Sequence, residues 1–238
     1  GSRYEETDTR KMYHYNDPLI LDEDFDYATQ VLADAKWVTN STVARVNVST
    51  DKLGFAWTSG ATDQGCYYDL GSVSDTKWLL KFVINYTSET ASGYHPIHNF
   101  FVSSSNSSLV YPVSSAGIGY QYAVGGTDLY FKSTISSGGE VAPSAVSWNA
   151  SANTDYYVEI KRTSATTAEM RVRTGSHSGT VVSTQLMTGI NSACIGLRYL
   201  RLQQYLTGSF GAVSGTIDDV EFYNGVTSAG NVWKEEGT

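Results

Sequence analysis

The feature that most constrains this chain is an alternation of apolar and polar residues with a period of two, which recurs between residues 42 and 223. Successive side chains of a β-strand point to opposite faces of a sheet, so this alternation predicts strands with one buried face. In the clearest run, Lys77–Thr87, the apolar positions are Trp78, Leu80, Phe82 and Ile84. We expect these four side chains to face the core between two packed sheets.

Similar runs follow one another along the chain, separated by Ser-Gly, Gly-Gly and Asn-Gly breaks. They cover Val43–Val48, Leu53–Trp57, Asn99–Ser103, Gly117–Val124, Leu129–Ser133, Tyr156–Arg162, Ala168–Arg173, Val181–Met187, Leu197–Gln203 and Ser214–Tyr223. Many short strands at this spacing predict an all-β sandwich or barrel. The 17 Tyr and 22 Gly agree, because Tyr suits a half-buried pleated surface and Gly supplies turns. Only Tyr27–Lys36 is expected to be helical, and no linker divides the region into two domains.

Charge and hydropathy exclude two kinds of partner. The net charge is −8 and the pI about 4.9. Nucleic-acid binding needs clustered Lys and Arg, so we expect no nucleic-acid partner. No apolar stretch is long enough to cross a bilayer, so we expect no membrane insertion.

Cysteines and sequons bear on the compartment. Cys66 and Cys194 match no metal-site spacing, and the sequence leaves open whether they form a disulfide or remain two buried thiols. Asn-x-Ser/Thr sequons fit an exposed, extracellular protein. They occur at Asn40, Asn47, Asn85, Asn106 and Asn149.

The two ends of the chain are predicted to pair with each other. Arg3–Glu6 and Arg10–Tyr15 are joined by a Thr-Asp-Thr turn, and Val232–Glu235 supplies a third segment. Together they predict a short β-meander. We therefore expect the Cα atoms of Asp17 and Asn231 to lie within about 10 Å of each other, roughly two strand spacings. The alternative is that the ends are two unrelated surface segments.

Read as one text, the end segments GSRYEETDTRKMYHYND and NVWKEEGT resemble a short module repeated in tail and other structural proteins of phages and archaeal viruses. This resemblance implies that residues 18–229 are a globular domain inserted into one turn of a small stalk unit. Residues 1–17 and 230–238 would form that unit.

Three internal segments resemble the concanavalin A-like lectin/glucanase superfamily. LDEDFDY at 21–27, followed by Trp37, is similar to its opening strand, and GTIDDVEFYN at 215–224 to its closing strand. YYVEIKR at 156–162 is similar to an intervening strand. The resemblance implies a jelly roll, an antiparallel two-sheet sandwich whose first and last strands pair. Val220 and Phe222 would then face inward, beside the strand that contains Phe25.

The sequence offers little for catalysis. Glucanases of this superfamily carry paired acids on one strand, spaced E-x-D-x-E or E-x-D-x-x-E, because glycoside hydrolysis needs two carboxyl groups about 5–9 Å apart. This chain has no such pattern: Glu159, Glu169 and Glu221 are single acids. Nucleophile elbows and phosphate-binding glycine loops are also absent from the sequence. We therefore expect no enzymatic activity.

Binding of a sugar is the better-supported chemistry, since sugars are held by aromatic faces and flanking polar groups. Tyr120 and Tyr122 stand on the same face of one predicted strand. Further candidates fall in or beside the polar stretch 88–115: Tyr94, His95, His98 and Tyr111. The alternative is that several of these tyrosines pack in the core or at a sheet edge. His95 and His98 fit a surface loop better than a metal site.

The superfamily resemblance also implies a candidate cation site. Related jelly rolls often hold Ca²⁺ where the opening acidic segment meets the closing strand, and carboxylate oxygens are ligands that Ca²⁺ prefers. The candidate ligands are Asp22, Asp24 or Asp26 together with Asp218 or Asp219. The alternative is that these acids are solvated or cap element ends. No cofactor is expected to be required.

Taken together, these resemblances predict a non-enzymatic virion structural or attachment protein at the virion surface or otherwise extracellular. Its lectin-like domain would bind a host-surface glycan or glycoprotein, or another surface ligand. Its other partners would be copies of itself, with a trimer as one arrangement, or other virion proteins. Two alternatives stay open: a purely structural fibre or capsid-decoration domain without a ligand, and a carbohydrate-binding module of a secreted enzyme.

Overall fold

The structure is a computed structural model that describes residues 3–6, 11–16, 18–39, 44–57, 65–89, 95–106, 115–124, 128–134, 140–141, 150–204, 212–229 and 232–235. For 3–6, 11–16, 89, 95–99, 122–124, 128–130, 132, 134, 140–141 and 232–235 it describes the backbone alone.

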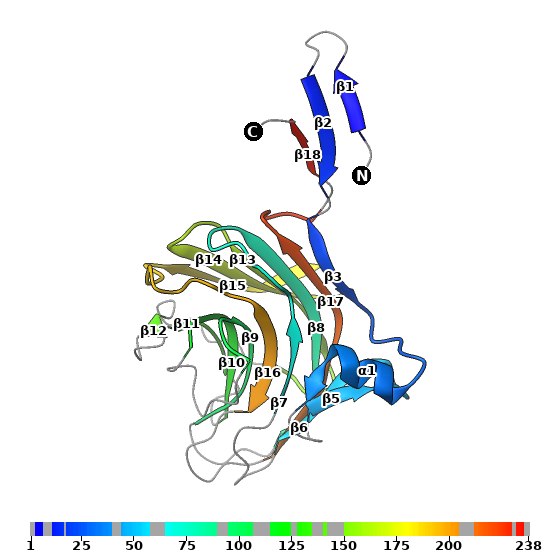
Figure 1. Cartoon of the computed structure of the whole chain (residues 1–238). Helices are drawn as coiled ribbons and strands as arrows, with labels where there is room; N and C mark the ends of the chain where they lie inside the picture. The colour runs from blue at the N-terminus through cyan, green and yellow to red at the C-terminus, as the bar shows by residue number, and fades with distance from the viewer. Residues whose placement is uncertain are drawn as a thin grey trace.

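Two antiparallel sheets pack face to face, which confirms the predicted all-β sandwich (Figure 1). The eight-stranded sheet runs in the order β15 (Thr180–Thr188), β14 (Thr167–Thr174), β13 (Asp155–Arg162), β8 (Trp78–Glu89), β17 (Val213–Asn224), β6 (Lys52–Trp57) and β5 (Ala44–Asn47), with β3 (Leu19–Glu23) also paired to β17. The seven-stranded sheet runs β12 (Glu140–Val141), β11 (Asp128–Thr134), β10 (Gly117–Val124), β9 (His95–Ser103), β16 (Tyr199–Gln204), β7 (Gly65–Asp69) and β4 (Val38–Thr39).

The core lies between these sheets and follows the alternation of the sequence. On β8 the predicted inward residues, Trp78, Leu80, Phe82 and Ile84, are each at most 1% exposed. The ring of Phe82 meets that of Phe100 on β9 at 4.9 Å between centroids. Aromatic side chains from both sheets therefore interlock, and such rings dominate the burial energy of a core.

The first and last strands pair, as predicted. β3 runs antiparallel to β17, with Leu21 opposite Phe222 and Glu23 opposite Val220. Val220 and Phe222 are fully buried on the inward face of β17.

The opening strand is shorter than predicted, because it ends at Glu23 and does not include Phe25. The buried Glu23 carboxylate accepts hydrogen bonds from the Phe25 amide at 2.8 Å, from Trp37 Nε1 at 3.2 Å and from the Tyr27 hydroxyl. Phe25 adopts a φ of 61° there, which turns the chain out of the sheet. Its side chain is still fully buried and packs on Trp37. The Glu23 carboxylate thus supplies the hydrogen-bond acceptor that a neighbouring strand would otherwise supply to the Phe25 amide.

The predicted helix is present but begins later than expected. α1 spans Gln30–Lys36, and the Thr29 hydroxyl caps it by accepting from the Leu32 amide at 3.4 Å. Thr is a favoured N-cap because its side chain satisfies an amide that has no partner within the helix. Only Ala33 of this short helix is buried. No helix in the described part of the chain is long and apolar enough to cross a membrane.

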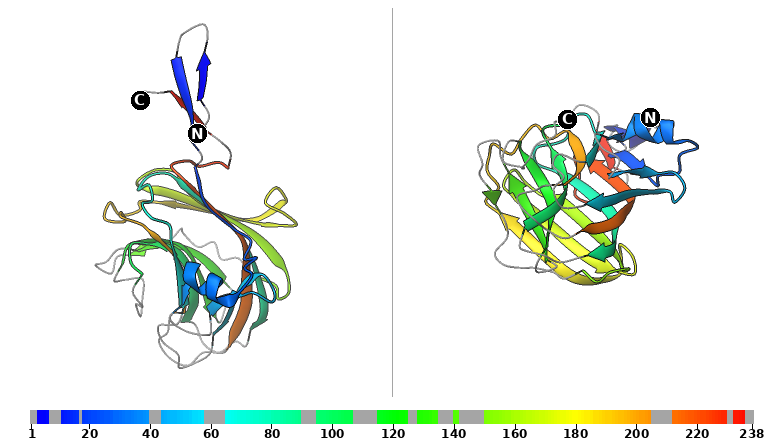
Figure 2. Two further views of the ribbon diagram at one scale, coloured as in Figure 1. Left: turned by 45° about the vertical axis from the view of Figure 1, so that its right-hand side comes forward. Right: turned by 90° about the horizontal axis from the view of Figure 1, so that it is seen from below.

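The chain ends form a third, three-stranded sheet of β1 (Arg3–Glu6), β2 (Lys11–Asn16) and β18 (Val232–Glu235). β18 pairs antiparallel with β2, with Val232 opposite Asn16. Figures 1 and 2 draw this sheet beyond one end of the sandwich. The predicted meander is thereby confirmed. Asp17 and Asn231 lie outside the described residues, and the division into a stalk unit and an inserted domain stays a prediction.

The two cysteines are separate buried thiols, which settles the question that the sequence left open. Cys66 lies on β7, and the Cys194 thiol donates to the carbonyl of Gly117 at 3.6 Å. Burial raises the pKa of both thiols, so neither is a reactive thiolate near neutral pH.

His177 gives the fold a pH dependence. It packs edge-on against Tyr157 at 5.3 Å, and neither ring nitrogen has a hydrogen-bond partner among the described residues. Burial lowers the pKa of His177 from 6.5 to about 4. The nearby positive charges of Lys81 and Arg173 act in the same direction, and the negative charge of Glu221 acts in the opposite direction. On acidification, the imidazole of His177 is therefore protonated at a higher pH in the unfolded chain than in the folded one. As a result, the free energy of unfolding falls as the pH drops from about 6.5 towards 4.

We predict that His177→Phe flattens this decline, because a Phe ring keeps the contact with Tyr157 and has no proton to bind. Urea unfolding of both proteins at pH 7, 5.5 and 4.5 checks it. The variant should match the parent or exceed it at pH 7, since no hydrogen bond is lost. An equal loss of stability in both proteins on acidification would contradict the assignment.

Candidate functional site

Tyr120 does not belong to a surface site, and this part of the sequence prediction is wrong. It lies on β10, is 1% exposed, and stacks on Phe82 at 5.6 Å between ring centroids. The alternation of β10 directs Ile118 and Tyr120 together towards the opposite sheet, where both are buried. Aromatic identity alone did not reveal which face of the strand the ring occupies.

The other predicted binding residues cannot be placed by side chain. Tyr94 and Tyr111 lie outside the described residues, and of His95, His98 and Tyr122 only the backbone is described. The register sets Tyr122 on β10 opposite His98 on β9. The role predicted for these five residues stays a prediction.

The outer face of the seven-stranded sheet carries polar groups where the inner face carries the core. Gln121 follows Tyr120 and points to this outer side, where it is 1% exposed and its Nε2 has no hydrogen-bond partner among the described residues. The register continues from Gln121 to Asn99 on β9 and then to Gln203 on β16. This row therefore carries three amide residues across three neighbouring strands.

Next to this row of amide residues, the same outer face carries Arg201 and two tyrosines. Arg201 pairs in register with Tyr67 on β7, and its Nη1 donates to the Ser105 carbonyl at 3.1 Å. Tyr67 and Tyr199 are each half-buried, and their rings meet edge to face at 5.6 Å. A cavity of about 10 Å³, room for about one water molecule, lies beside Tyr67 and Arg201.

Polar groups border the tyrosine pair on both sides. Asn106 Nδ2 donates to the Tyr67 hydroxyl at 3.3 Å, and the Arg198 guanidinium lies 5.2 Å from the Tyr199 ring centroid. We call Tyr67, Asn106, Arg198 and Tyr199 the tyrosine platform.

Asp69 holds Arg198 in place over the platform. Both carboxylate oxygens of Asp69 accept from Arg198, at 2.8 and 2.7 Å. The guanidinium lowers the pKa of Asp69, and Asp69 in turn raises the pKa of Arg198. The pair is exposed, so its contribution to stability is small and its effect is to orient the guanidinium.

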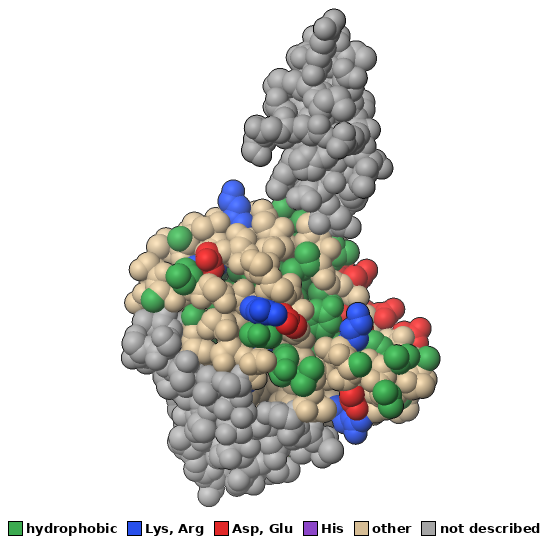
Figure 3. Space-filling view, in the orientation of Figure 1, with side chains coloured by type: hydrophobic (Ala, Val, Ile, Leu, Met, Phe, Trp, Pro, Cys, Tyr) green, Lys and Arg blue, Asp and Glu red, His purple; other side chains and the backbone are tan. Residues whose placement is uncertain are grey.

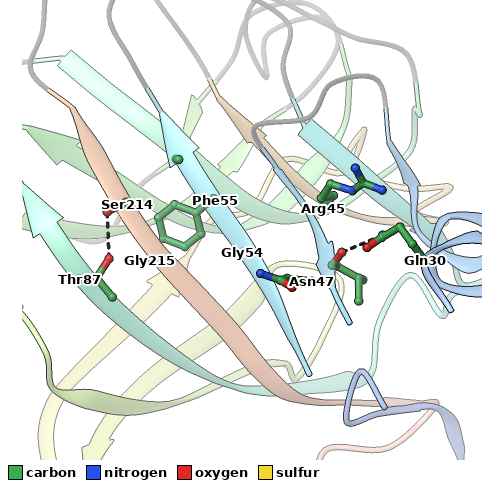
Figure 4. Close-up of a pocket in the computed structure, with 10 residues that line it drawn as sticks. Gln30, Arg45, Asn47, Gly54, Phe55, Thr87, Ser214 and Gly215 are labelled. Atoms are coloured by element: carbon green, nitrogen blue, oxygen red, sulfur yellow. Dashed lines mark hydrogen bonds between the residues drawn. The ribbon is translucent and has the colours of Figure 1, made fainter. Parts of the chain in front are cut away.

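The outer face of the eight-stranded sheet contains a trough of about 450 Å³ over β8, β17, β6 and β5 (Figure 4). Thr87 and Ser214 stand on one side of it and Gln30 and Arg45 on the other, with Gly54 between them. Thr87 Oγ1 and Ser214 Oγ are hydrogen-bonded at 2.9 Å. The trough is open because the outward residues of its central strands, Gly54 and Ala56 on β6 and Ser214 on β17, have small side chains.

Two of the acids predicted to bind Ca²⁺, Asp218 and Asp219, occupy a bulge in β17. Asp219 has a φ of 48°, which Asp tolerates better than most residues, and here the register with β8 shifts. Asp218 is paired with Lys52 at 2.5 Å. Burial and the adjacent Asp218 raise the pKa of Asp219, to which Asp24 also contributes.

The geometry gives the calcium prediction no support. Asp22, Asp24 and Asp26 are exposed, and within the described ranges no three acids, histidines or cysteines are grouped so that they could hold a metal ion. On the face shown in Figure 3, charged side chains of both signs are scattered among hydrophobic and other side chains.

The sequence matches no known protein family, and no curated protein is recognisably similar to it. Solved structures with the same architecture exist. One, from work on endo-acting O-glycanases of the human gut microbiota, has a TM-score of 0.59 at 14% identity, over 87% of this chain and 99% of that one. The lectin UEA-II in complex with galactose has 0.57 at 10%, over 87% and 99%.

The binding domain of botulinum neurotoxin serotype D/C has a TM-score of 0.58 at 13% identity over 87% of this chain. The matched part is about half (48%) of the neurotoxin structure. These similarities confirm the concanavalin A-like jelly roll. At such identities they show the fold alone, and they lend no support to the viral resemblance of the chain ends.

The tyrosine platform was missed by sequence reasoning, although part of its signal was present. Tyr199, Arg201 and Gln203 alternate with Leu200 and Leu202, which marks a polar outer face on β16. Tyr67 and Asn106 reach the same face from distant parts of the chain, and no local pattern announces them.

We predict that Tyr120→Ala lowers the free energy of unfolding by about 3–5 kcal/mol, the usual cost of truncating a buried aromatic side chain. Tyr67→Ala should cost far less, because that ring is half-buried at the surface. Urea denaturation followed by tryptophan fluorescence compares the two. A Tyr120→Ala protein as stable as the parent would contradict the burial of this ring.

Proposed function

We propose that the protein binds glycans, and that the tyrosine platform is the contact surface. The observation that carries this proposal is the pair of half-exposed rings, Tyr67 and Tyr199, bordered by hydrogen-bonding side chains on the outer face of the seven-stranded sheet. An aromatic face covers the apolar side of a sugar ring, and adjacent amides and guanidinium groups bind its hydroxyls.

The order of the platform supports this use. Asn106 fixes the Tyr67 hydroxyl and Asp69 fixes the Arg198 guanidinium, so these groups lose little freedom when a ligand binds. The similar folds of a galactose-binding lectin and of O-glycanases make a sugar a reasonable ligand, by analogy of fold alone.

The proposed activity is binding without catalysis. Three described strand glutamates are engaged by Lys side chains. Lys81 pairs with Glu221 at 2.7 Å, and Lys161 pairs with Glu169 at 3.1 Å and lies 3.9 Å from Glu159. Arg171 also contacts Glu169, at 2.6 Å. Glycoside hydrolysis needs one carboxyl group free to donate a proton and a second one opposite it. These ion pairs favour a binding role.

The finer proposal is a virion structural or attachment protein, displayed at the virion surface or otherwise extracellular, that contacts a host-surface glycan or glycoprotein. It rests on the paired chain ends, which would carry the sandwich on a small stalk. The alternatives are a structural fibre or capsid-decoration domain without a ligand, and a carbohydrate-binding module of a secreted enzyme.

A glycan array with the purified protein and a Tyr67→Ala/Tyr199→Ala double variant tests the binding proposal. We expect the parent to bind a defined subset of glycans and the double variant to lose that binding while it keeps its far-ultraviolet spectrum. Tyr157→Ala, which removes a half-buried tyrosine from the other sheet, is the matched control and should bind as the parent does. If the parent binds no glycan, the purely structural alternative takes its place.

We also propose that copies of the chain associate through β15, an edge strand of the eight-stranded sheet. Three of its apolar side chains are exposed: Val181 (44%), Val182 (41%) and Leu186 (55%). Edge strands with exposed apolar residues pair readily with other chains unless charges protect them.

Leu186→Lys should therefore shift the protein towards the monomer, as measured by light scattering after size exclusion. Ile195→Lys is the control, because Ile195 is similarly exposed (53%) but lies off this strand. A parent protein that stays monomeric at high concentration would refute association through β15.

A further inference from the structure

We infer that the trough on the eight-stranded sheet is a second binding site, for an uncharged, hydroxyl-rich ligand of the size of a sugar ring. It lies on the sheet opposite to the tyrosine platform and does not depend on the function proposed for that platform. Its volume of about 450 Å³ is within the range of small-molecule sites, roughly 300–1,000 Å³.

The first argument is Gly54, for which the described residues give no structural reason to be glycine. It lies inside β6, opposite Thr216 on one side and Arg45 on the other, without a register shift in either pairing. Glycine weakens a strand interior, and it usually marks a bulge, a bend, or a place where another backbone or a ligand comes close.

The other glycines with described surroundings do have such a reason. Gly65, Gly119, Gly179 and Gly215 would each bring a Cβ to 2.2 Å or less from a backbone oxygen. Gly71, Gly175, Gly189, Gly196 and Gly225 adopt a positive φ. Among the described residues, a Cβ on Gly54 would meet nothing closer than the Arg45 carbonyl at 3.9 Å, and the φ of Gly54 is not positive. Backbone strain, and crowding by the described part of the chain, thus do not account for Gly54, and close approach of a ligand is a reason that fits its place in the trough.

The second argument is Arg45, which has a donor without an acceptor. Its Nη2 pairs with Asp34 at 3.0 Å, whereas its Nε is buried and has no hydrogen-bond partner among the described residues. A buried donor without a partner is costly, and the side chain that carries it lines the trough.

The third argument is the set of neutral polar groups around the trough. Gln30 uses its amide nitrogen on Asp34 and on the Val46 carbonyl, both at 2.8 Å, which holds its carbonyl oxygen as an acceptor. Thr87 and Ser214 present hydroxyl groups that both donate and accept.

The charges at the trough cancel, because Arg45, the one charged residue among those that line it, is paired with Asp34. Neutral donors and acceptors without net charge match hydroxyl groups better than carboxylates, phosphates or ammonium groups. The ligand class that fits is therefore a neutral saccharide.

Titration of the ¹⁵N-labelled protein with the methyl glycosides of glucose, galactose and N-acetylglucosamine and, as a charged comparison, of glucuronic acid tests this inference. The protein is produced in bacteria, so that the sequon at Asn47, which lines the trough, carries no glycan. We expect at least one glycoside to shift the amide resonances of Gly54, Ala56 and Ser214 in a saturable manner. Resonances of Tyr67 and Tyr199 report separately on the tyrosine platform, so failure of one site is distinguished from failure of the other.

Gly54→Val is the decisive variant, since Val is favoured in strands and its side chain would fill the trough. It should abolish the shifts at Ala56 and Ser214. Thr184→Val, at an exposed position on β15 of the same sheet, should preserve them. If Gly54→Val does not fold, Ala56→Val, which also lines the trough, replaces it. Shifts that persist in the folded variant overturn the inference, as does binding of methyl glucuronide alone or of no glycoside at all.

Discussion

The contact on which this fold depends is the aromatic packing of Phe82 against Phe100 and Tyr120, which joins the two sheets at the middle of the core. Phe82 lies on β8, a central strand that pairs with β13 on one side and β17 on the other. Because β8 and β17 align the remaining strands of their sheet, the position of this one ring sets how the two sheets face each other. The outer faces of the two sheets, where a ligand can bind, are therefore also positioned by this contact.

Local alternation made the architecture predictable. The inward residues of β8 and β17 were identified because apolar side chains recur at every second position, on β17 to either side of the bulge at Asp218 and Asp219. β7 was not foreseen, since Gly65, Cys66, Tyr67 and Tyr68 show no such alternation. The opening strand was drawn too long because the sequence does not show that the Glu23 carboxylate takes over hydrogen bonding from the sheet.

The sites were less predictable than the fold, for two physical reasons. An aromatic residue serves equally well inside and outside a sheet, so Tyr120 was assigned to the surface although it fills the core. The tyrosine platform depends on the long-range pairing of β7 with β16, and the trough depends on a missing side chain at Gly54. Neither kind of information is contained in a local pattern of residue types.

The pairing of the chain ends has a mechanical consequence. β2 with β18, and then β3 with β17, are antiparallel pairs whose outer ends both lead towards the termini. A force that pulls the two termini apart would load the hydrogen bonds of each pair one after another, as in a zipper, and would not shear them all at once. The terminal sheet would therefore open before the sandwich does. It would act as a weak link that yields first and shields the core from tension.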